Sequence, residues 1–209
     1  NKKNSKISAK FIQLKSIIEI EPAYNEVQAI KQISNQRWDM AFAPPGLAAI
    51  ATYKYSYQPI LPLEGVEKLR SVIVANQDSR FQTIQDLGGA SIALGQEGSA
   101  TSYYLPIYNL YGVTLQKVIF SPTPKTSLTL LEQGEVASAA LSLQEYNQHR
   151  QEYKPKQFRI IDIDSHTIPS GAIIISDKIS PQKIELIEKS LTQAPSHIAA
   201  SAKFLPNER

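Results

Sequence analysis

Residues 95–106 read GQEGSATSYYLP, and they directly follow the apolar run Ser91–Leu94. That run has the length and composition of a short buried strand. Gly95 and Gly98 favour a tight turn immediately behind it. Ser99 then stands where a helix N-cap is expected, ahead of a helical pattern. The segment therefore predicts a strand, a tight turn and a helix start in direct succession.

A helix start of this composition is suited to an anion. The backbone N–H groups of Thr101 and Ser102 are expected to lack partners inside the helix, and the helix dipole adds positive partial charge there. Ser99, Thr101 and Ser102 add hydroxyl donors beside those amides. Two interpretations are open from these residues alone: an ordinary helix cap, because serine is common at that position, or a site for a small oxyanion.

The same alternation of apolar runs and amphipathic stretches continues along the chain. The apolar runs predict short buried strands at Ile17–Ile20, Met40–Ala43, Val72–Ala75, Ser91–Leu94, Val118–Phe120, Ala137–Leu141, Arg159–Ile163 and Ala172–Ile175. The amphipathic stretches predict helices at Asn25–Ser34, Thr101–Tyr111, Ser127–Glu132, Gln144–Tyr153 and Pro181–Leu191. Such alternation favours an α/β fold with mostly parallel sheets and helices on both faces.

Two segments predict that the chain crosses between two lobes. They lie near Leu69–Asn76 and Asp164–Ala172, and a complete strand–helix set stands between them. We therefore assign residues 1–76 and 166–209 to lobe 1 and residues 77–165 to lobe 2. Because ligands of open α/β sheets bind outside the carboxyl ends of the strands, two facing lobes predict a ligand cleft.

Composition excludes several kinds of chemistry. The 22 basic and 19 acidic residues give a net charge of +3 without a long basic block, which gives little support for nucleic-acid binding. The absence of cysteine removes disulfides, thiolate zinc sites and cysteine nucleophiles. His149, His166 and His197 lie on different predicted elements without metal-ligand spacing, so no metal site is predicted. No apolar run approaches the length of a membrane-spanning helix.

Five segments in order resemble the periplasmic phosphate-, phosphite- and phosphonate-binding proteins of ABC transporters. They are residues 37–45 (RWDMAFAPP), 71–79 with 84–89 (SVIVANQDS and IQDLGG), 99–106 (SATSYYLP), 133–137 (QGEVA) and 168–171 (IPSG). The resemblance covers nearly the whole chain. It enters the family pattern near residues 8–14, so we expect the family's first strand and loop to precede this sequence.

This resemblance implies the two-lobed type 2 periplasmic-binding-protein fold and a solute-binding component of an ABC importer. It implies no enzymatic activity, no catalytic residues and no cofactor. The expected partners are a small oxyanion, held between the lobes, and an ABC permease in the membrane, with no nucleic acid. The chain is expected to be a monomer that is periplasmic or otherwise extracytoplasmic, either free or anchored to the membrane.

The predicted ligand residues combine the resemblance with the strand ends. They are Ser99, Thr101, Ser102, Tyr103, Thr126, Ser142, Ser170, Tyr24 and Phe42. This sequence departs from the family pattern at four places. Residues 124–126 stand where the family has a histidine, and Ala137 replaces the aspartate of its "GxVD" turn. Ser142 and Gly171 replace two further acidic residues.

The departures at Ser142 and Gly171 bear on ligand choice. A buried ammonium must be paired with a carboxylate, and neither residue supplies one. We therefore expect a ligand without an amine: phosphate, phosphite or a small alkyl phosphonate. Asp162 and Asp164 alternate along a predicted strand and are expected on one solvated face. Either of them, or a residue of the family's N-terminal strand and loop, could replace the lost acid.

Two other functions fit the same fold. One is an enzyme acting on a small metabolite, which would need a positioned acid, base or nucleophile. The predicted cleft residues are neutral hydroxyls, which suits reversible binding better. The other is the ligand-binding domain of a sensor. Finally, Tyr53, Tyr55 and Tyr57 have the spacing of one strand face and are expected in packing or partner contacts rather than in ligand binding.

Overall fold

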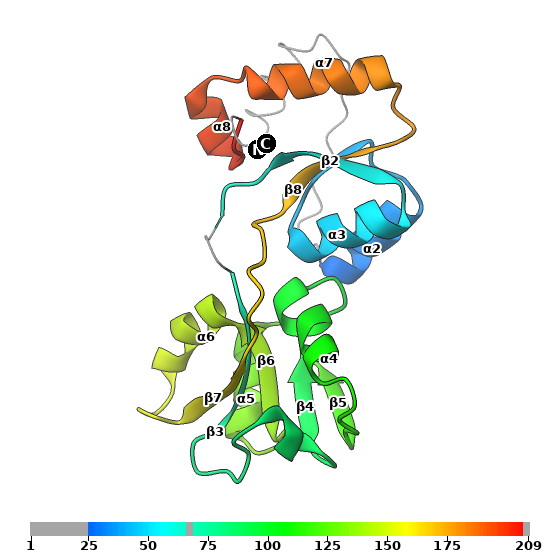
Figure 1. The fold of residues 1–209 in the computed structure, drawn as a ribbon. Coiled ribbons are helices and arrows are strands. Elements are labelled where there is room, and N and C mark those ends of the chain that lie inside the picture. Colours follow the sequence, from blue (N-terminus) through cyan, green and yellow to red (C-terminus); the bar gives the residue numbers. More distant parts are fainter. Residues whose placement is uncertain (1–24, 66–68, 207–209) are drawn as a thin grey trace. The chain divides into compact units, whose positions relative to one another are not determined.

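The computed structural model describes residues 25–65 and 69–206, and the chain divides into two compact units (Figure 1). Unit 2 is the continuous segment Lys68–Ile168, and unit 1 is made of the chain on both sides of it. The predicted strand Ile17–Ile20 and the predicted ligand residue Tyr24 lie outside the described residues.

Unit 1 is built on an antiparallel sheet. Its described strands lie in the order β1 (Met40–Ala43), β8 (Ala172–Ser176) and β2 (Tyr57–Pro62). The three consecutive isoleucines Ile173–Ile175 of the central strand are fully buried. Because side chains alternate across a strand, an unbroken apolar run indicates a strand covered on both faces.

Helices lie on both faces of the unit 1 sheet. On one face, α7 (Pro181–Thr192) and α8 (Ser196–Ala202) enclose the cluster of Ile173 and Ile175. On the other face lie α2 (Glu26–Ser34) and α3 (Pro45–Lys54) (Figure 1). The predicted helices of this unit start and stop close to the expected residues, because their caps are local: α2 begins at Asn25, and α7 begins with proline.

Unit 2 contains a sheet of five described strands in the order β5-β4-β6-β3-β7. Their bounds are β5 (Lys117–Phe120), β4 (Ser91–Leu94), β6 (Ser138–Ser142), β3 (Ser71–Asn76) and β7 (Phe158–Ile163). The first three run parallel, and β3 runs antiparallel to both of its neighbours. As a result, the carboxyl ends of β5, β4, β6 and β7 and the start of β3 share one edge of the sheet.

Both faces of the unit 2 sheet carry helices. One face holds a core with α5 (Pro124–Glu132), α6 (Leu143–His149) and η3 (Arg150–Glu152). The other face holds a core that includes Ile92 and Leu94, beside η1 (Ile84–Leu87), η2 (Ala100–Tyr104) and α4 (Leu105–Asn109). This covering explains why the central strands are apolar along their whole length.

The chain passes between the units next to one paired site. Ile168 N donates a hydrogen bond to Leu69 O at 3.0 Å, in an isolated antiparallel bridge. The unit boundary at residues 67–68 lies directly before the expected crossing segment Leu69–Asn76, and the boundary at residues 168–169 lies within the expected segment Asp164–Ala172. The unit boundary differs from our expected lobe boundary after Asn76, because β3 pairs with β6 and β7 along its length and so belongs to unit 2.

The described sheet of unit 1 is antiparallel and that of unit 2 is mixed, which corrects our expectation of mostly parallel sheets. Among the described strands, the pairs β1–β8, β2–β8, β3–β6 and β3–β7 are antiparallel, and only β4–β5 and β4–β6 are parallel. The reason is topological. Strands joined by a helix within one unit run parallel, whereas β3 and β8 each enter their sheet just after a crossing and run against their neighbours.

The expectation that Tyr53, Tyr55 and Tyr57 share one strand face is wrong, whereas packing is confirmed for Tyr57. Tyr53 lies in α3 and is 89% exposed, Tyr55 ends that helix, and Tyr57 begins β2 and is 3% exposed. The three side chains therefore share no strand face. Tyr57 contributes to unit 1 through its hydroxyl, which donates to Trp38 O at 2.7 Å. Burial raises the pKa of Tyr57, and the charge of Asp39 adds to that rise.

Candidate functional site

The β4–η2 turn, residues 95–102, leaves the carboxyl edge of the unit 2 sheet. Gly95 N donates to Ser102 O at 2.9 Å and closes the turn. A Cβ at position 95 would lie 2.0 Å from Ser102 Oγ and 2.8 Å from Ser102 Cβ, so only glycine fits. Gly98 has φ +111°, a conformation that favours glycine. Both glycines that predicted the turn are therefore required by its geometry.

Ser99 caps the helix that follows the turn. Its Oγ accepts hydrogen bonds from Ser102 N at 3.2 Å and from Ser102 Oγ at 2.7 Å. Tyr104 N donates to Ser99 O at 3.0 Å, so the first helical turn is π-helical, a form found often at functional sites. We expected the Ser102 amide to be free. It is instead bound by the Ser99 cap, which satisfies one of the donors at the helix start.

Thr101 is a buried polar residue of the same turn and is only 6% exposed. Its carbonyl oxygen accepts a hydrogen bond from Ser71 Oγ at 2.5 Å. Its hydroxyl forms no hydrogen bond with any described residue, and the buried Oε1 of Gln96 has no partner there either. Leaving a buried polar group unpaired costs about 1–3 kcal/mol. In this turn Gln96 Oε1 is such a buried atom, and the Thr101 hydroxyl is a donor that can reach a polar ligand at this position.

Ser142 lies at the same sheet edge as Thr101. It ends β6 and pairs in register with Ser71, the residue whose hydroxyl contacts Thr101. Its own Oγ donates to Glu145 Oε2 at 2.8 Å and accepts from Glu145 N at 3.1 Å. This reciprocal capping box starts α6. Ser142 therefore has the predicted position, and its hydroxyl already has two partners in the helix cap.

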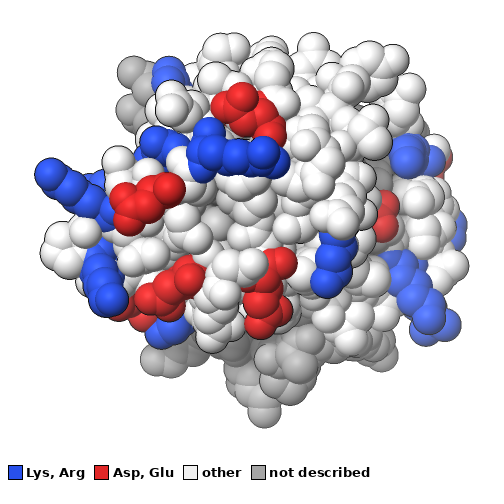
Figure 2. Space-filling model, turned by 90° about the horizontal axis from the view of Figure 1, so that it is seen from below, with Lys and Arg blue, Asp and Glu red and all other residues white. Residues whose placement is uncertain are grey.

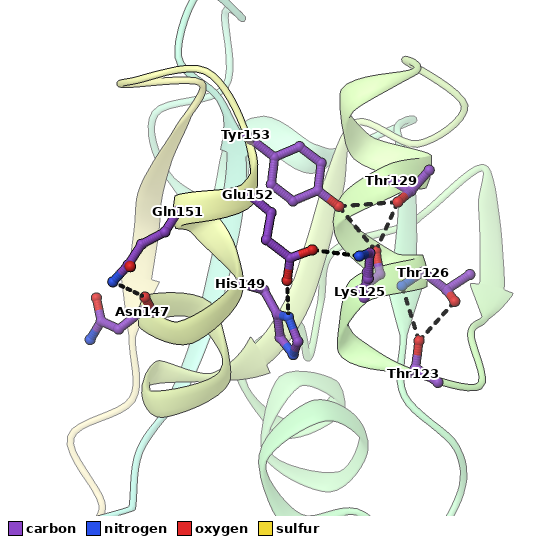
Figure 3. Close-up of polar contacts among 9 residues, drawn as sticks. All are labelled: Thr123, Lys125, Thr126, Thr129, Asn147, His149, Gln151, Glu152 and Tyr153. Carbon is purple, nitrogen blue, oxygen red and sulfur yellow. Dashed lines mark hydrogen bonds and ion pairs between the residues drawn. The ribbon is translucent and has the colours of Figure 1, made fainter.

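Thr126 lies in the first turn of α5, which follows β5. Thr126 N donates to Thr123 Oγ1 at 3.1 Å, and the two hydroxyl oxygens lie 2.8 Å apart (Figure 3). Beside them Lys125 forms an ion pair with Glu152, which also lies 2.9 Å from His149 Nδ1. The hydrogen bond from Lys125 lowers the pKa of Glu152. The positive charge of Lys125 is thus balanced by a neighbouring acid.

The remaining predicted ligand residues of the described chain belong to unit 1. Phe42 in β1 is 46% exposed, and its ring centroid lies 6.4 Å from that of Phe204 in an edge arrangement. Ser170 packs against Gly65, where a Cβ would lie 2.5 Å from Ser170 Cβ. The structure thus gathers Ser99, Thr101, Ser102 and Tyr103 in one turn of unit 2. It places Ser142 and Thr126 in unit 2, and Phe42 and Ser170 in unit 1.

Gly171 replaces a family acid and has a strict structural requirement. Its φ is +109°, and a Cβ there would lie 2.3 Å from Ala43 O and 3.0 Å from Pro44 Cα. The start of β8 therefore approaches the backbone at the end of β1 too closely for any side chain. Glycine at this position is explained by packing within unit 1.

A group of polar residues that sequence reasoning did not assemble lies at the end of β7. Asn109 Nδ2 in α4 donates to Asp164 Oδ2 at 2.8 Å and to Asp162 Oδ2 at 3.2 Å. Asp164 Oδ1 accepts from His166 N at 2.7 Å and lies 2.9 Å from His166 Nδ1. Asp164 is 4% exposed, so the expected solvated face is wrong for this residue. The alternating aspartates were visible in the sequence, whereas their contact with Asn109 was not.

The two carboxyl groups have pKa values shifted in opposite directions. Burial disfavours ionisation of Asp164, but the hydrogen bonds from Asn109 and His166 outweigh it, and the pKa of Asp164 is lowered. For Asp162 burial is the largest effect, Asn109 opposes it in part, and the charge of Asp164 adds to it, so the pKa of Asp162 is raised. The two groups should therefore contribute to stability with opposite signs.

We expect the variants Asp164→Asn and Asp162→Asn to change stability in opposite directions near neutral pH. A lowered folded pKa gives stabilisation that is present above the unfolded value, about 3.9, and lost as pH falls through the folded value. A raised folded pKa gives a cost at neutral pH that disappears on acidification. Asp164→Asn should thus lower the melting temperature and Asp162→Asn should raise it, with both differences shrinking in acid. Thermal unfolding over a pH series measures this, and shifts of equal sign would contradict it.

Comparisons with known proteins show to which family this chain belongs. The sequence matches, over residues 12–204, the family described as ABC transporter, phosphonate, periplasmic substrate-binding protein. No curated protein matches the chain. Among solved structures, the XAC2383 protein of Xanthomonas citri bound to ATP is similar with a TM-score of 0.79 at 16% identity, covering 96% of this chain and 80% of that one.

Two further solved structures come from phosphonate systems. A binding protein component of an ABC phosphonate transporter (PA3383) from Pseudomonas aeruginosa has a TM-score of 0.66 at 14% identity, covering 95% of this chain and 72% of that one. PhnD1 from Prochlorococcus marinus, in complex with methylphosphonate, has a TM-score of 0.62 at 15% identity, covering 98% of this chain and 88% of that one.

These likenesses define the class of protein. The fold is that of type 2 periplasmic binding proteins, as the resemblance implied. The chain belongs to the family of periplasmic phosphonate-binding proteins of ABC transporters, and it is the solute-binding component of such a transporter. The small ligand and the membrane permease are its partners as a member of that family. Within residues 25–65 and 69–206, no helix is long and apolar enough to cross a membrane.

Proposed function

We propose that the chain binds a small phosphorus oxyanion without an amine, namely phosphate, phosphite or a small alkyl phosphonate, at the β4–η2 turn. The observation that carries this proposal is Thr101, a polar side chain only 6% exposed at a helix start, whose hydroxyl has no partner among the described residues. An oxyanion there would accept this hydrogen bond and would lie in the positive field of the helix start.

Two of the similar structures hold ligands that fit this chemistry. One carries methylphosphonate and another ATP, and both ligands contain tetrahedral phosphorus with charged oxygens. In this chain the hydroxyls of Ser99 and Ser102 lie beside Thr101 in the same turn. Ser102 already donates to Ser99 Oγ, so the hydroxyl hydrogens of Ser99 and Thr101 are the side-chain donors that could reach the acceptor oxygens of a tetrahedral oxyanion.

We infer that the ligand has no amine from the acidic residues that the chain offers for pairing with one. The two positions where the resemblance places acids hold Ser142 and Gly171, and Gly171 has no room for a side chain. Asp162 and Asp164 could have replaced these acids, but both accept hydrogen bonds from Asn109, and Asp164 also contacts His166. Because both carboxylate oxygens of Asp164 and Oδ2 of Asp162 already have partners, we do not expect these residues to bind a ligand ammonium group.

We expect phosphate, phosphite and methylphosphonate to bind more tightly than 2-aminoethylphosphonate. Isothermal titration calorimetry with these four ligands measures the order, using the full-length protein. The physical reason is that the ammonium would lose its hydration without gaining a carboxylate. A clear preference for 2-aminoethylphosphonate would show that Asp162 or another acid serves the ligand. Failure of all four ligands to bind would overturn the proposed function.

We also propose that the chain is not an enzyme. An enzyme on this fold would need an acid, base or nucleophile at the site. Two described histidines lie 2.9 Å from a carboxylate, His166 beside Asp164 and His149 beside Glu152, yet no described hydroxyl contacts the other ring nitrogen of either histidine. The hydrogen bond from His166 N to Asp164 Oδ1 makes the first pair a local turn beside the crossing at Ile168, and Glu152 of the second pair is also bound by Lys125. This supports a structural role.

We further propose a monomer that works outside the cytoplasm, free or anchored, and does not bind nucleic acid. On the face shown in Figure 2, basic and acidic side chains are interspersed rather than gathered by sign, in keeping with the net charge of +3. Nucleic-acid binding ordinarily needs a basic patch or stripe. The ligand-binding domain of a sensor would use the same site. Measuring ligand uptake in cells with and without the protein distinguishes the two roles, because only transport makes uptake depend on the protein.

A further inference from the structure

An exposed phenylalanine stands beside the β4–η2 turn. Phe120 is the last residue of β5 and pairs in register with Leu94, the last residue before the turn. Its side chain is 58% exposed, although phenylalanine has no polar atom that would favour contact with water. Phe120 therefore lies one strand away from the start of the turn that carries the proposed oxyanion site, a spacing of ~5 Å.

Phe120 continues a row of aromatic rings that begins in the turn. Tyr103 directly follows Ser102, and its ring centroid lies 5.9 Å from that of Phe120 with the planes 36° apart. Tyr104 adds a third ring, 5.0 Å from Tyr103 and nearly perpendicular to it. A partly exposed pair of rings thus connects the end of β5 with the β4–η2 turn.

The position of Phe120 separates it from the core. Its register partner Leu94 and the neighbouring Ile92 are buried in the core cluster on the α4 side of the sheet. Phe120 is not part of that cluster, and β5 is an edge strand of the described sheet. A single exposed apolar residue is ordinary on a protein surface. Its placement beside the β4–η2 turn is what matters, because ligand sites combine a few polar groups with apolar and aromatic walls.

We propose that Phe120 and Tyr103 form a subsite for a flat, aromatic substituent of the bound phosphorus oxyanion. This rests on the proposed function, because the β4–η2 turn must hold the oxyanion for the substituent to reach the rings. The substituent would contact the exposed ring of Phe120 in an offset or edge geometry. The substrate class is then an organic phosphonate or phosphate ester that carries an aromatic group, in addition to the small anions.

The test is calorimetric titration of the full-length protein with phenylphosphonate, cyclohexylphosphonate and methylphosphonate. We expect phenylphosphonate to bind severalfold more tightly than methylphosphonate, and more tightly than the equally bulky cyclohexyl compound, because only the flat ring can stack. In Phe120→Ala the ratio of phenyl to methyl affinity should fall to about one, and Phe120→Trp should restore it. Val118→Ala is the matched control, since Val118 lies on the same face of β5 and is 37% exposed.

The outcomes separate the two proposals. Binding of methylphosphonate without any preference for phenylphosphonate would overturn the aromatic subsite and leave the oxyanion site standing. The aromatic subsite is likewise overturned if Phe120→Ala and Val118→Ala lower the affinity ratio equally. If none of the three compounds binds, both proposals fail. Melting temperatures of the variants, measured beside the titrations, show whether a lost preference comes from a damaged fold.

Discussion

Gly171→Ala should destabilise unit 1 by about 3 kcal/mol. A positive φ disfavours any residue other than glycine by roughly 1 kcal/mol. A larger effect comes from the contact itself, because the new Cβ would lie 2.3 Å from Ala43 O and 3.0 Å from Pro44 Cα. Both atoms belong to the backbone, so they move only if the end of β1 separates from β8, and overpacking of this kind typically costs 1–3 kcal/mol. Urea denaturation followed by circular dichroism measures the loss.

Gly134→Ala is the matched control for the conformational part of this effect. Gly134 also has a positive φ, +72°, but nothing lies within 4 Å of the position of its Cβ. It should therefore lose only the roughly 1 kcal/mol that the backbone conformation costs. Equal destabilisation by the two substitutions would contradict a steric cost of placing a Cβ beside Ala43 O.

Thr101→Val should weaken binding of the phosphorus oxyanion about tenfold or more. Valine keeps the shape and β-branching of threonine and removes only the hydroxyl. A hydrogen bond to a charged group is worth about 1.5–3 kcal/mol, and 1.4 kcal/mol corresponds to a tenfold change in affinity. The unbound protein should lose no stability, because the Thr101 hydroxyl has no described partner to lose. Calorimetric titration with the best ligand of the panel measures the change.

Thr192→Val serves as the control for that substitution. The hydroxyl of Thr192 donates to Glu188 O at 2.8 Å within α7, so it is satisfied inside its own helix. Its replacement should leave ligand affinity unchanged. If Thr101→Val and Thr192→Val both bind as the wild type does, the Thr101 hydroxyl does not contact the ligand and the proposed site is misplaced.

The elements that were predictable from sequence are those whose signals are local. Ser91–Leu94 is a strand with the expected bounds, and the glycines behind it make the expected turn. The strand β2 was missed because Pro59 and Pro62 interrupt its pattern. Proline is tolerated there since β2 is an edge strand of the described sheet and has a register shift between Pro59 and Leu61.

The site was predictable only in part for the same reason. The β4–η2 turn is one continuous segment, so its hydroxyls could be gathered by reading along the chain. The burial of Asp164 depends on Asn109, which lies 55 residues earlier, and no spacing rule connects the two. Likewise, the sequence does not show that Ser99 binds the Ser102 amide while the Thr101 hydroxyl has no described partner, because this depends on the π-helical geometry of the turn.

The paired passage between the units has a consequence for the order of folding. Leu63 N bonds to Gly171 O at 3.1 Å in unit 1, and Ile168 N bonds to Leu69 O at 3.0 Å in unit 2. If unit 1 formed first, it would have to close a loop containing all of unit 2, and the entropy cost of closure grows by ~0.6 kcal/mol with each doubling of loop length. Once unit 2 has folded, its own bridge holds the two ends together, and only a few residues remain to be closed. We therefore expect unit 2 to fold before unit 1, with β8 joining β1 and β2 as the last long-range step.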